Sequence, residues 1–316
     1  TAVKNENYYK MGADGQALPY LDSVVVQIIG DEAVMAANME SGDIDAVDFF
    51  YDQNYIDEFN ANDDIVLYKI ASQTQYILYM NMQKEPFDNV KVREALCYAF
   101  DRDECIDVLL NGDGFKTPTI VLPTQTFYRD GKIYDYNPEK SKEILEAAGC
   151  EMGDDGFYYR DGEKVGFVIS VSAGDQVRID MAQIAAQELK EIGMDVSVEI
   201  PAQTDWAGQM AFLIGWGSPF DADDHTYKVF GTDKGANYSG YSNADVDKYL
   251  TEARQSADPE VRAEAYANFQ KALAEDPAYA MICYIDANYV ADSNIKGIDP
   301  DTIMGHHGVG IFWNVA

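Results

Sequence analysis

The stretch GWGSPFDADDH, from Gly215 to His225, places one tryptophan, one phenylalanine, three aspartates and one histidine close together in the chain. Three carboxylates at near-alternate positions are ligands that a hard cation such as calcium prefers. A carboxylate pair beside a histidine is also typical of sites for general acid–base catalysis. The residue types therefore allow a metal site or a catalytic cluster, and the wider sequence has to decide between them.

Spacing excludes a calcium loop of the EF-hand type. In a loop starting at Asp221, the sixth position requires glycine and the last requires glutamate, but the chain has Thr226 and Thr232 there. A zinc site needs several His, Cys or carboxylate ligands, and the three histidines of the chain form no H-x-x-x-H pair. The sequence therefore predicts no metal site made of protein side chains.

Nucleophilic catalysis and phosphate binding also lack their sequence patterns. No G-x-S-x-G turn, G-x-G-x-x-G loop or G-x-x-x-x-G-K-[ST] loop occurs. The cysteines Cys97, Cys105, Cys150 and Cys283 are widely scattered, and apolar surroundings favour buried thiols at Cys97 and Cys283. A Cys97–Cys105 or Cys150–Cys283 disulfide stays open. We therefore expect a protein that is not an enzyme.

The opening stretch is typical of a strand end followed by a helix start. The apolar run FLIGWGSPF ends in a Gly–Ser–Pro turn, and strand ends in α/β proteins are where ligands bind. The rings of Trp216 and Phe220 offer stacking area there, with plain core packing as the alternative. Asp221, Asp223 and Asp224 precede HTYKVF, where an acid would accept backbone N–H groups and oppose the helix dipole.

The elements that would position this stretch alternate between helices and strands. Asp31 and Gly42 bound a short helix, with Gly42 expected at positive φ. Asn137 and Asp258 each precede a proline that suits the first position of a helix. Helical spacing of apolar residues in DQVRIDMAQIAAQELKEIG is followed by the period-two strand DVSVEI. This alternation predicts an α/β protein with covered sheets.

Length and charge limit the classes of function. The chain of 316 residues is long enough for two lobes, and its 47% apolar content indicates a globular protein. A formal net charge of −32 without any Lys/Arg-rich run disfavours nucleic acid and anionic membranes as partners. No apolar run approaches the roughly 18 residues of a membrane span, and TAVKNENYYK has no signal-peptide pattern.

Four segments in order resemble the extracellular solute-binding proteins of family 5, which serve ABC importers of dipeptides, oligopeptides and nickel complexes. The resemblance covers nearly the whole chain and implies a two-lobed α/β fold of the class II periplasmic-binding-protein type. It also implies that the chain is a C-terminal portion of such a protein, with one lobe complete and the other partial. The segments are LPYLDSVVVQIIGDEAVMAANMESGDIDAV, YMNMQKEPFDNVKVREALCYAFDRDECIDVLLNGDG, YDYNPEKSKEILEAAG and NYSGYSNADVDKYLTEARQSADPEVRAEAYANFQKALAEDPAYAMICYI.

The resemblance implies a domain division and a mode of action. Residues 1–82 and 285–316 would form the partial lobe I, and residues 83–284 the complete lobe II. Such a protein closes around its solute by a hinge and delivers it to the transmembrane subunits of an ABC permease. We expect a monomer without a cofactor or nucleic-acid partner, located outside the cell as a surface lipoprotein or in the periplasm.

Within the opening stretch, the resemblance implies a ligand-binding wall. In peptide-binding members an aspartate three residues after the tryptophan meets the ligand's ammonium group, but here that position is Pro219. WGSPFDADD instead resembles the W-G-A-P-Y-D-P form of the nickel-complex branch. We expect a short peptide or a similar small solute as the ligand. The alternative is a nickel or other metal chelate, or another non-peptide solute. The rival functional class is a sensor or an enzyme on the same fold. The expected ligand-binding residues are Trp216, Ser218, Phe220, Asp221 and Asp223.

Overall fold

The computed structural model describes the whole chain except residues 13, 49, 124, 174, 218–220, 299–314 and 316. It divides into two compact units, one made of Thr1–Gln73 and Ile285–Ala316 and the other of Thr74–Tyr284. Strands β4 (Ile65–Met80) and β12 (Tyr279–Asp292) run from one unit into the other. The second unit is therefore inserted between two segments of the first.

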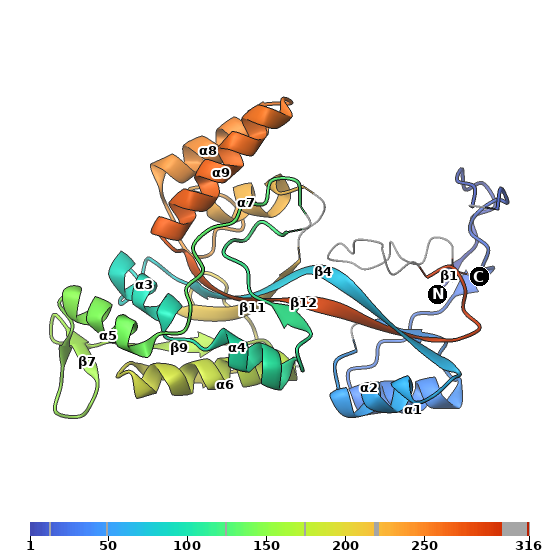
Figure 1. The fold of residues 1–316 in the computed structure, drawn as a ribbon, viewed down its shortest axis with the longest axis horizontal. Coiled ribbons are helices and arrows are strands. Elements are labelled where there is room, and N and C mark those ends of the chain that lie inside the picture. The colour runs from blue at the N-terminus through green and yellow to red at the C-terminus, as the bar shows by residue number, and fades with distance from the viewer. Residues whose placement is uncertain are drawn as a thin grey trace. The chain divides into compact units, whose positions relative to one another are not determined.

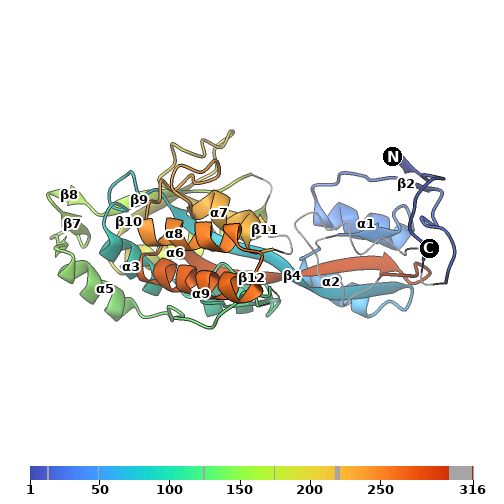
Figure 2. The same ribbon diagram turned by 90° about the horizontal axis from the view of Figure 1, so that it is seen from above.

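The predicted α/β class is confirmed, because helices and strands alternate along both units (Figures 1 and 2). None of the helices in the described ranges is long and apolar enough to cross a membrane. The first unit contains β1 (Ala2–Val3), β2 (Ser23–Val24), α1 (Glu32–Ser41), β3 (Ala46–Val47) and α2 (Gln53–Asn60). The second contains α3 (Val90–Tyr98), α4 (Arg102–Glu104), a π-helical turn (Cys105–Leu109), β5 (Gly114–Phe115), α5 (Pro138–Ala147), β6 (Glu151–Met152), β7 (Tyr158–Arg160), β8 (Glu163–Lys164), β9 (Gly166–Ser170), α6 (Gln176–Glu191), β10 (Asp195–Glu199), β11 (Ala211–Gly217), α7 (Asp223–Phe230), α8 (Ala244–Gln255) and α9 (Pro259–Glu275).

One mixed sheet organises the second unit. Its strands follow the order β10-β9-β11-β4-β12, with β9 parallel to both β10 and β11 and with β4 antiparallel to β11. Helix α6 connects β9 to β10, as a parallel pair requires. Figure 1 shows α7, α8 and α9 on one side of the strands and α6 on the other, so both faces are covered.

One hydrophobic core of the second unit lies between the sheet and α7–α9. Ile77 of β4 faces this core together with Leu250 of α8 and Phe269 of α9, and all three side chains are buried. We expected the boundary between the lobes after residue 82, but residues 74–82 lie in the second unit. The reason is that residues 74–80 pair one by one with β11 and carry core side chains. The identity of the two units with the two lobes stays a prediction.

The first unit has a smaller core and a row of exposed apolar side chains. Phe50, Phe59 of α2 and Met39 of α1 are buried against one another and their neighbours. In contrast, Val24, Val25, Val26 and Ile28 are exposed, and 99% of the Ile28 side chain's reference surface is accessible.

Helix boundaries follow the chemistry that the sequence predicts. Asp31 accepts a hydrogen bond from the Val34 N–H at 3.1 Å, and Gly42 ends α1 at φ 75°, where a side chain would be strained. Asn137 and Asp258 cap α5 and α9, each followed by proline. These three predicted helices are confirmed.

Arg93 ties α3 to the chain that precedes β12. The residue is 5% exposed, and its Nε donates to the Pro277 carbonyl at 2.9 Å while Nη1 donates to the Phe87 carbonyl at 2.6 Å. Its Nη2 pairs with the Asp276 carboxylate. All three nitrogens of this buried guanidinium therefore have partners.

Replacing Arg93 with methionine should lower the free energy of unfolding by roughly 3–5 kcal/mol, because the change leaves buried carbonyl acceptors and the Asp276 carboxylate without their partner. Urea denaturation followed by circular dichroism measures the difference. Lys91→Met is the matched control, since Lys91 is exposed on the same helix and its pair with Glu94 contributes about 0–1 kcal/mol. Equal losses in the two variants would contradict this account.

Candidate ligand-binding site

Strand β11 positions Trp216 next to the start of the second unit. The predicted strand is confirmed, and its register with β4 places Trp216 opposite Gln75 and Gly217 opposite Thr74. Phe212, Ile214 and Trp216 share one face of β11 because side chains alternate along a strand. Trp216 is partly exposed. Its ring is therefore accessible at the end of the strand.

This face of β11 lines a small apolar cavity of about 30 Å³, which is room for roughly two water molecules. Ile214 and Trp216 meet Ile77 and Tyr79 of β4 there, with Phe230 of α7 at the side. Almost all of the lining surface is apolar. The cavity suits a methyl group or a short apolar side chain rather than a charged group.

Two aromatic residues from loops complete the same wall. The ring of Trp206 stacks on Tyr238 with centroids 5.5 Å apart and meets Phe212 edge-on at 4.8 Å. The Tyr79 hydroxyl donates to the Trp206 carbonyl at 2.8 Å, which holds the loop against β4. Neither Trp206 nor Tyr238 was predicted from the sequence. The signal available for Trp206 was a lone tryptophan between two strands, which does not reveal where its loop folds.

The predicted aspartates each face a cation of the protein. Arg262 Nη2 donates to Oδ1 and Oδ2 of Asp221 at 2.7 and 2.9 Å. Asp223 lies 3.7 Å from the Nε of Arg254. Asp224 pairs with Lys228 one turn further along α7, at 2.9 Å. Ser218 and Phe220, the other predicted members of the wall, lie outside the described residues, as does Pro219.

Burial and pairing affect the two nearer acids differently. Partial burial acts to raise the pKa of Asp221, but hydrogen bonds from Arg262 and from the Asp223 N–H outweigh it and hold this pKa below its usual range. Burial raises the pKa of Asp223. Asp223 Oδ1 is buried and has no hydrogen-bond partner in the described part of the chain. An incoming ammonium group would therefore compete with Arg262 or Arg254.

An acid does accept a backbone N–H at the start of α7, as expected, but it lies one residue before the N-cap position. Ala222 occupies the N-cap position of α7 and forms no side-chain cap, since it has no polar atom. Asp221, one residue earlier, accepts the Asp223 N–H at 2.9 Å. Asp223 and Asp224 lie in the first turn, where negative charge opposes the helix dipole.

His225 is a buried structural residue. Its Nε2 lies 3.0 Å from the Ile120 carbonyl oxygen, which can only accept, so Nε2 carries the hydrogen. Burial lowers the pKa of His225 to about 4. A neutral, fully enclosed imidazole is not placed to act on a ligand beside Trp216.

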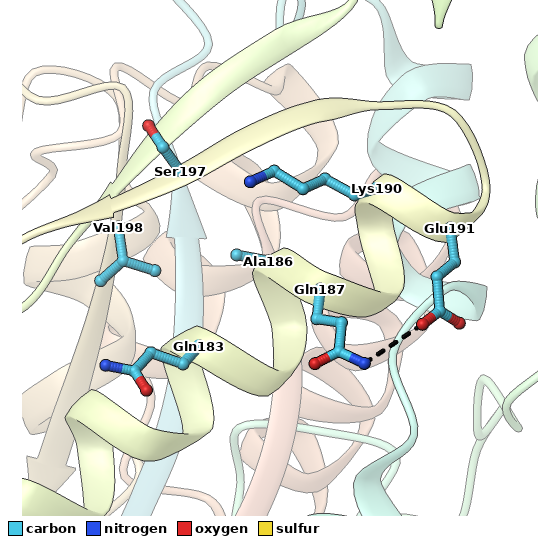
Figure 3. A pocket seen from close by; sticks show the side chains of 7 residues that line it. All are labelled: Gln183, Ala186, Gln187, Lys190, Glu191, Ser197 and Val198. Atoms are coloured by element: carbon cyan, nitrogen blue, oxygen red, sulfur yellow. Dashed lines mark hydrogen bonds between the residues drawn. The ribbon is translucent and has the colours of Figure 1, made fainter. Parts of the chain in front are cut away.

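Larger surface hollows and acidic clusters elsewhere do not resemble a binding site. Figure 3 shows the side chains of an open groove of about 540 Å³ between α6 and β10, among them Gln187 donating to Glu191 at 3.2 Å. Its polar lining residues are exposed, whereas ligand sites are usually enclosed and apolar.

Asp101, Glu104 and Glu188 form the one acidic cluster in the described ranges with metal-like spacing. Burial raises the pKa of Glu188 to about 7, and its Oε2 accepts the Asp101 N–H at 3.0 Å.

The thiols are likewise structural. Cys97, Cys105, Cys150 and Cys283 are all buried and free, so neither of the disulfides left open by the sequence forms. Burial raises the pKa of Cys97 and of Cys283 to about 12. Neither thiol is therefore an activated nucleophile.

Comparison with known proteins gives consistent relatives. The family described as bacterial extracellular solute-binding proteins, family 5 Middle, matches residues 1–238. The oligopeptide-binding protein AppA of Bacillus subtilis is 30% identical, with 93% of this chain and 57% of AppA covered. The dipeptide-binding protein of Escherichia coli is 24% identical over 92% of this chain and 55% of its own length. The chain thus spans little more than half of the curated relatives that it matches.

Solved structures agree in fold. NikZ of Campylobacter jejuni in complex with Ni(L-His) superimposes with a TM-score of 0.82 at 31% identity, covering 90% of this chain and 60% of NikZ. AppA of Bacillus subtilis with a bound nonapeptide gives 0.83 at 26% identity, covering 94% of this chain and 61% of that structure. The predicted fold class is confirmed by these likenesses.

The pH dependence of stability should report the burial of His225. The folded state keeps this imidazole neutral down to about pH 4, whereas an unfolded chain binds a proton below about pH 6.5. Its contribution to the free energy of unfolding is therefore lost as the pH falls through this window, by about 2 kcal/mol between pH 7.5 and 5. Urea denaturation at both values measures the loss.

His225→Gln keeps a donor toward Ile120 but cannot titrate. We expect this variant to have a lower free energy of unfolding than wild type at pH 7.5. The difference between the two should become smaller at pH 5. Asp224→Asn is the control, because this neighbour on the same helix is exposed. A gap independent of pH would contradict the assignment.

Proposed function

Since this chain belongs to the bacterial extracellular solute-binding proteins of family 5, we propose that it is part of the solute-binding component of an ABC importer. In this proposal it captures a small peptide-like solute and delivers it to the transmembrane subunits of a permease. No bond of the solute is made or broken, so the protein is not an enzyme. The observation that carries the proposal is the family match over residues 1–238.

The proposed contribution of the second unit is the aromatic wall around Trp216. The ring is partly exposed at the end of β11, and the apolar cavity beside it can receive a short side chain. Aromatic surface of this kind supplies large contact area at a small cost in conformational entropy. Ser218 and Phe220 follow directly in the sequence and are proposed to extend the wall. AppA of Bacillus subtilis, an oligopeptide-binding protein that was solved with a nonapeptide, supports a peptide-like solute.

A metal chelate is the second candidate because of the acidic turn. Asp221 is held by Arg262, and Asp223 lies 3.7 Å from Arg254, so a peptide's amino terminus would have to compete with an arginine for either carboxylate. A buried ammonium without a counter-charge would be costly. NikZ, which is 31% identical, was solved with Ni(L-His). A compact chelate would need stacking more than an acidic partner.

We further propose that the protein acts outside the cell, as a surface lipoprotein or in the periplasm, and as a monomer. Closure driven by the solute would follow the population-shift scheme, in which only contacts that differ between open and closed states favour closing. A receptor role without transport would use the same binding step. A transport assay with the ABC permease that the protein is proposed to serve distinguishes these two roles.

The ligand class can be tested on the full-length protein. Native mass spectrometry of the purified protein should show a co-purifying small solute, and calorimetry with a short-peptide library and with nickel–histidine should identify its class. Binding of short peptides supports the first candidate, and binding of the nickel complex alone supports the second. Failure of every probe, with no co-purified solute, would overturn the function.

Trp216→Ala should weaken solute binding by about 1–3 kcal/mol, or roughly 5- to 150-fold, because the wall loses its stacking surface. Tyr136→Ala is the matched control, since Tyr136 is an exposed aromatic residue outside the Trp216 cavity. Thermal melting of both variants shows that they are folded. Unchanged affinity in Trp216→Ala would remove Trp216 from the site while leaving the family function intact.

A further inference from the structure

A second cavity of the second unit is lined by a buried cation that the proposed function does not use. Arg102 begins α4 and is 4% exposed. Its Nη1 donates to the Met281 carbonyl at 3.3 Å. Nε and Nη2 are buried and have no hydrogen-bond partner among the described residues. Two N–H donors of a buried charged group therefore lack acceptors, and Arg102 borders a space that the described side chains do not fill.

That space is a cavity of about 30 Å³. Room for a water molecule requires ~10–15 Å³ on the same measure, so the cavity can hold about two waters or one small ion. The other polar groups of its lining already bond elsewhere: the Tyr134 hydroxyl donates to the Ala274 carbonyl at 2.5 Å, and Gln270 Nε2 donates to the carbonyls of Phe127 and Tyr266. Arg102 is thus the lining residue whose N–H donors lack acceptors among the described residues.

The charge of Arg102 is only partly compensated, because burial lowers its pKa while Asp135 and Asp103 oppose this effect from beyond ion-pair distance. No carboxylate of the described residues lies at ion-pair distance from it; Asp103 and Asp135 instead pair with Lys116, at 2.7 and 3.7 Å. Cys97, which lines the cavity, could oppose the charge only as a thiolate, and burial raises its pKa to about 12. A water molecule would satisfy the N–H donors but bring no charge. A buried cation is stabilised only when a negative charge is present as well.

We propose that this cavity binds a small monovalent anion, chloride or a halide of similar size, through Nε and Nη2 of Arg102. A halide accepts several N–H donors without requiring a fixed geometry, and its volume suits the cavity. Tetrahedral oxyanions such as sulfate are too large for it. The ion would join α4 to α9 and β12, whose residues line the same space. It would therefore be a structural ligand, independent of the transported solute.

Chloride NMR tests the proposal on the purified protein. Exchange with the site should broaden the chloride line beyond the broadening given by an Arg102→Met variant, and bromide should compete the excess away while sulfate at equal ionic strength should not. Arg129→Met is the control for the loss of one positive charge, because Arg129 is exposed in the same unit. We expect this control to keep the excess broadening.

Equal broadening in wild type and Arg102→Met would overturn the proposal, as would competition by sulfate, because both outcomes indicate surface binding or a cavity that holds water only. If Arg102→Met does not fold, crystals of the wild-type protein soaked in bromide provide the second measurement. An anomalous peak at hydrogen-bond distance from Nε and Nη2 supports the site. A bromide-soaked crystal without that peak rejects it.

Discussion

The antiparallel pairing of β11 with the second half of β4 is the constraint on which the second unit depends. It runs without interruption from Ala211 opposite Met80 to Gly217 opposite Thr74. A slip of one residue would turn Ile214 and Trp216 to the other face, because side chains alternate. The same slip would disturb the packing of Ile77 against the helices that cover the sheet. The aromatic wall and the core are therefore fixed by one register.

Charge is managed locally in this acidic protein. Although the net charge is −32, the acids that follow β11 are matched one by one by Arg262, Arg254 and Lys228. Two buried arginines show opposite solutions to desolvation. Arg93 has a partner for each nitrogen, whereas among the described residues Arg102 has an acceptor for Nη1 alone, the Met281 carbonyl. Arg93 therefore secures the packing of α3 directly, while the packing around Arg102 calls for a further negative group.

Much of the fold was predictable because its signals are local. Capping residues, a proline after the cap and a glycine at positive φ bound α1, α5 and α9 by chemistry within a few residues. The division into lobes at residue 82 stays a prediction; no local signal marks where the compact units divide, because β4 is one continuous strand and its pairing with β11 begins at Thr74. Trp216 was identifiable at its strand end. The contributions of Trp206 and Tyr238, and the pairing of Asp221 with Arg262, depend on contacts distant in sequence and left no pattern to read.

The insertion of the second unit into the first has a consequence for biosynthesis. The first unit needs β12 to complete its core, since Val290 packs with Phe50 and Phe59, and β12 leaves the ribosome only after the whole second unit has been made. The second unit can close on its own, because Tyr284 at its end bonds to Gln75 at its start, at 2.8 Å. The segment that precedes the second unit therefore obtains the last member of its core late in translation. Completion of the first unit's core thus follows synthesis of the second unit, although the first unit begins earlier in this sequence.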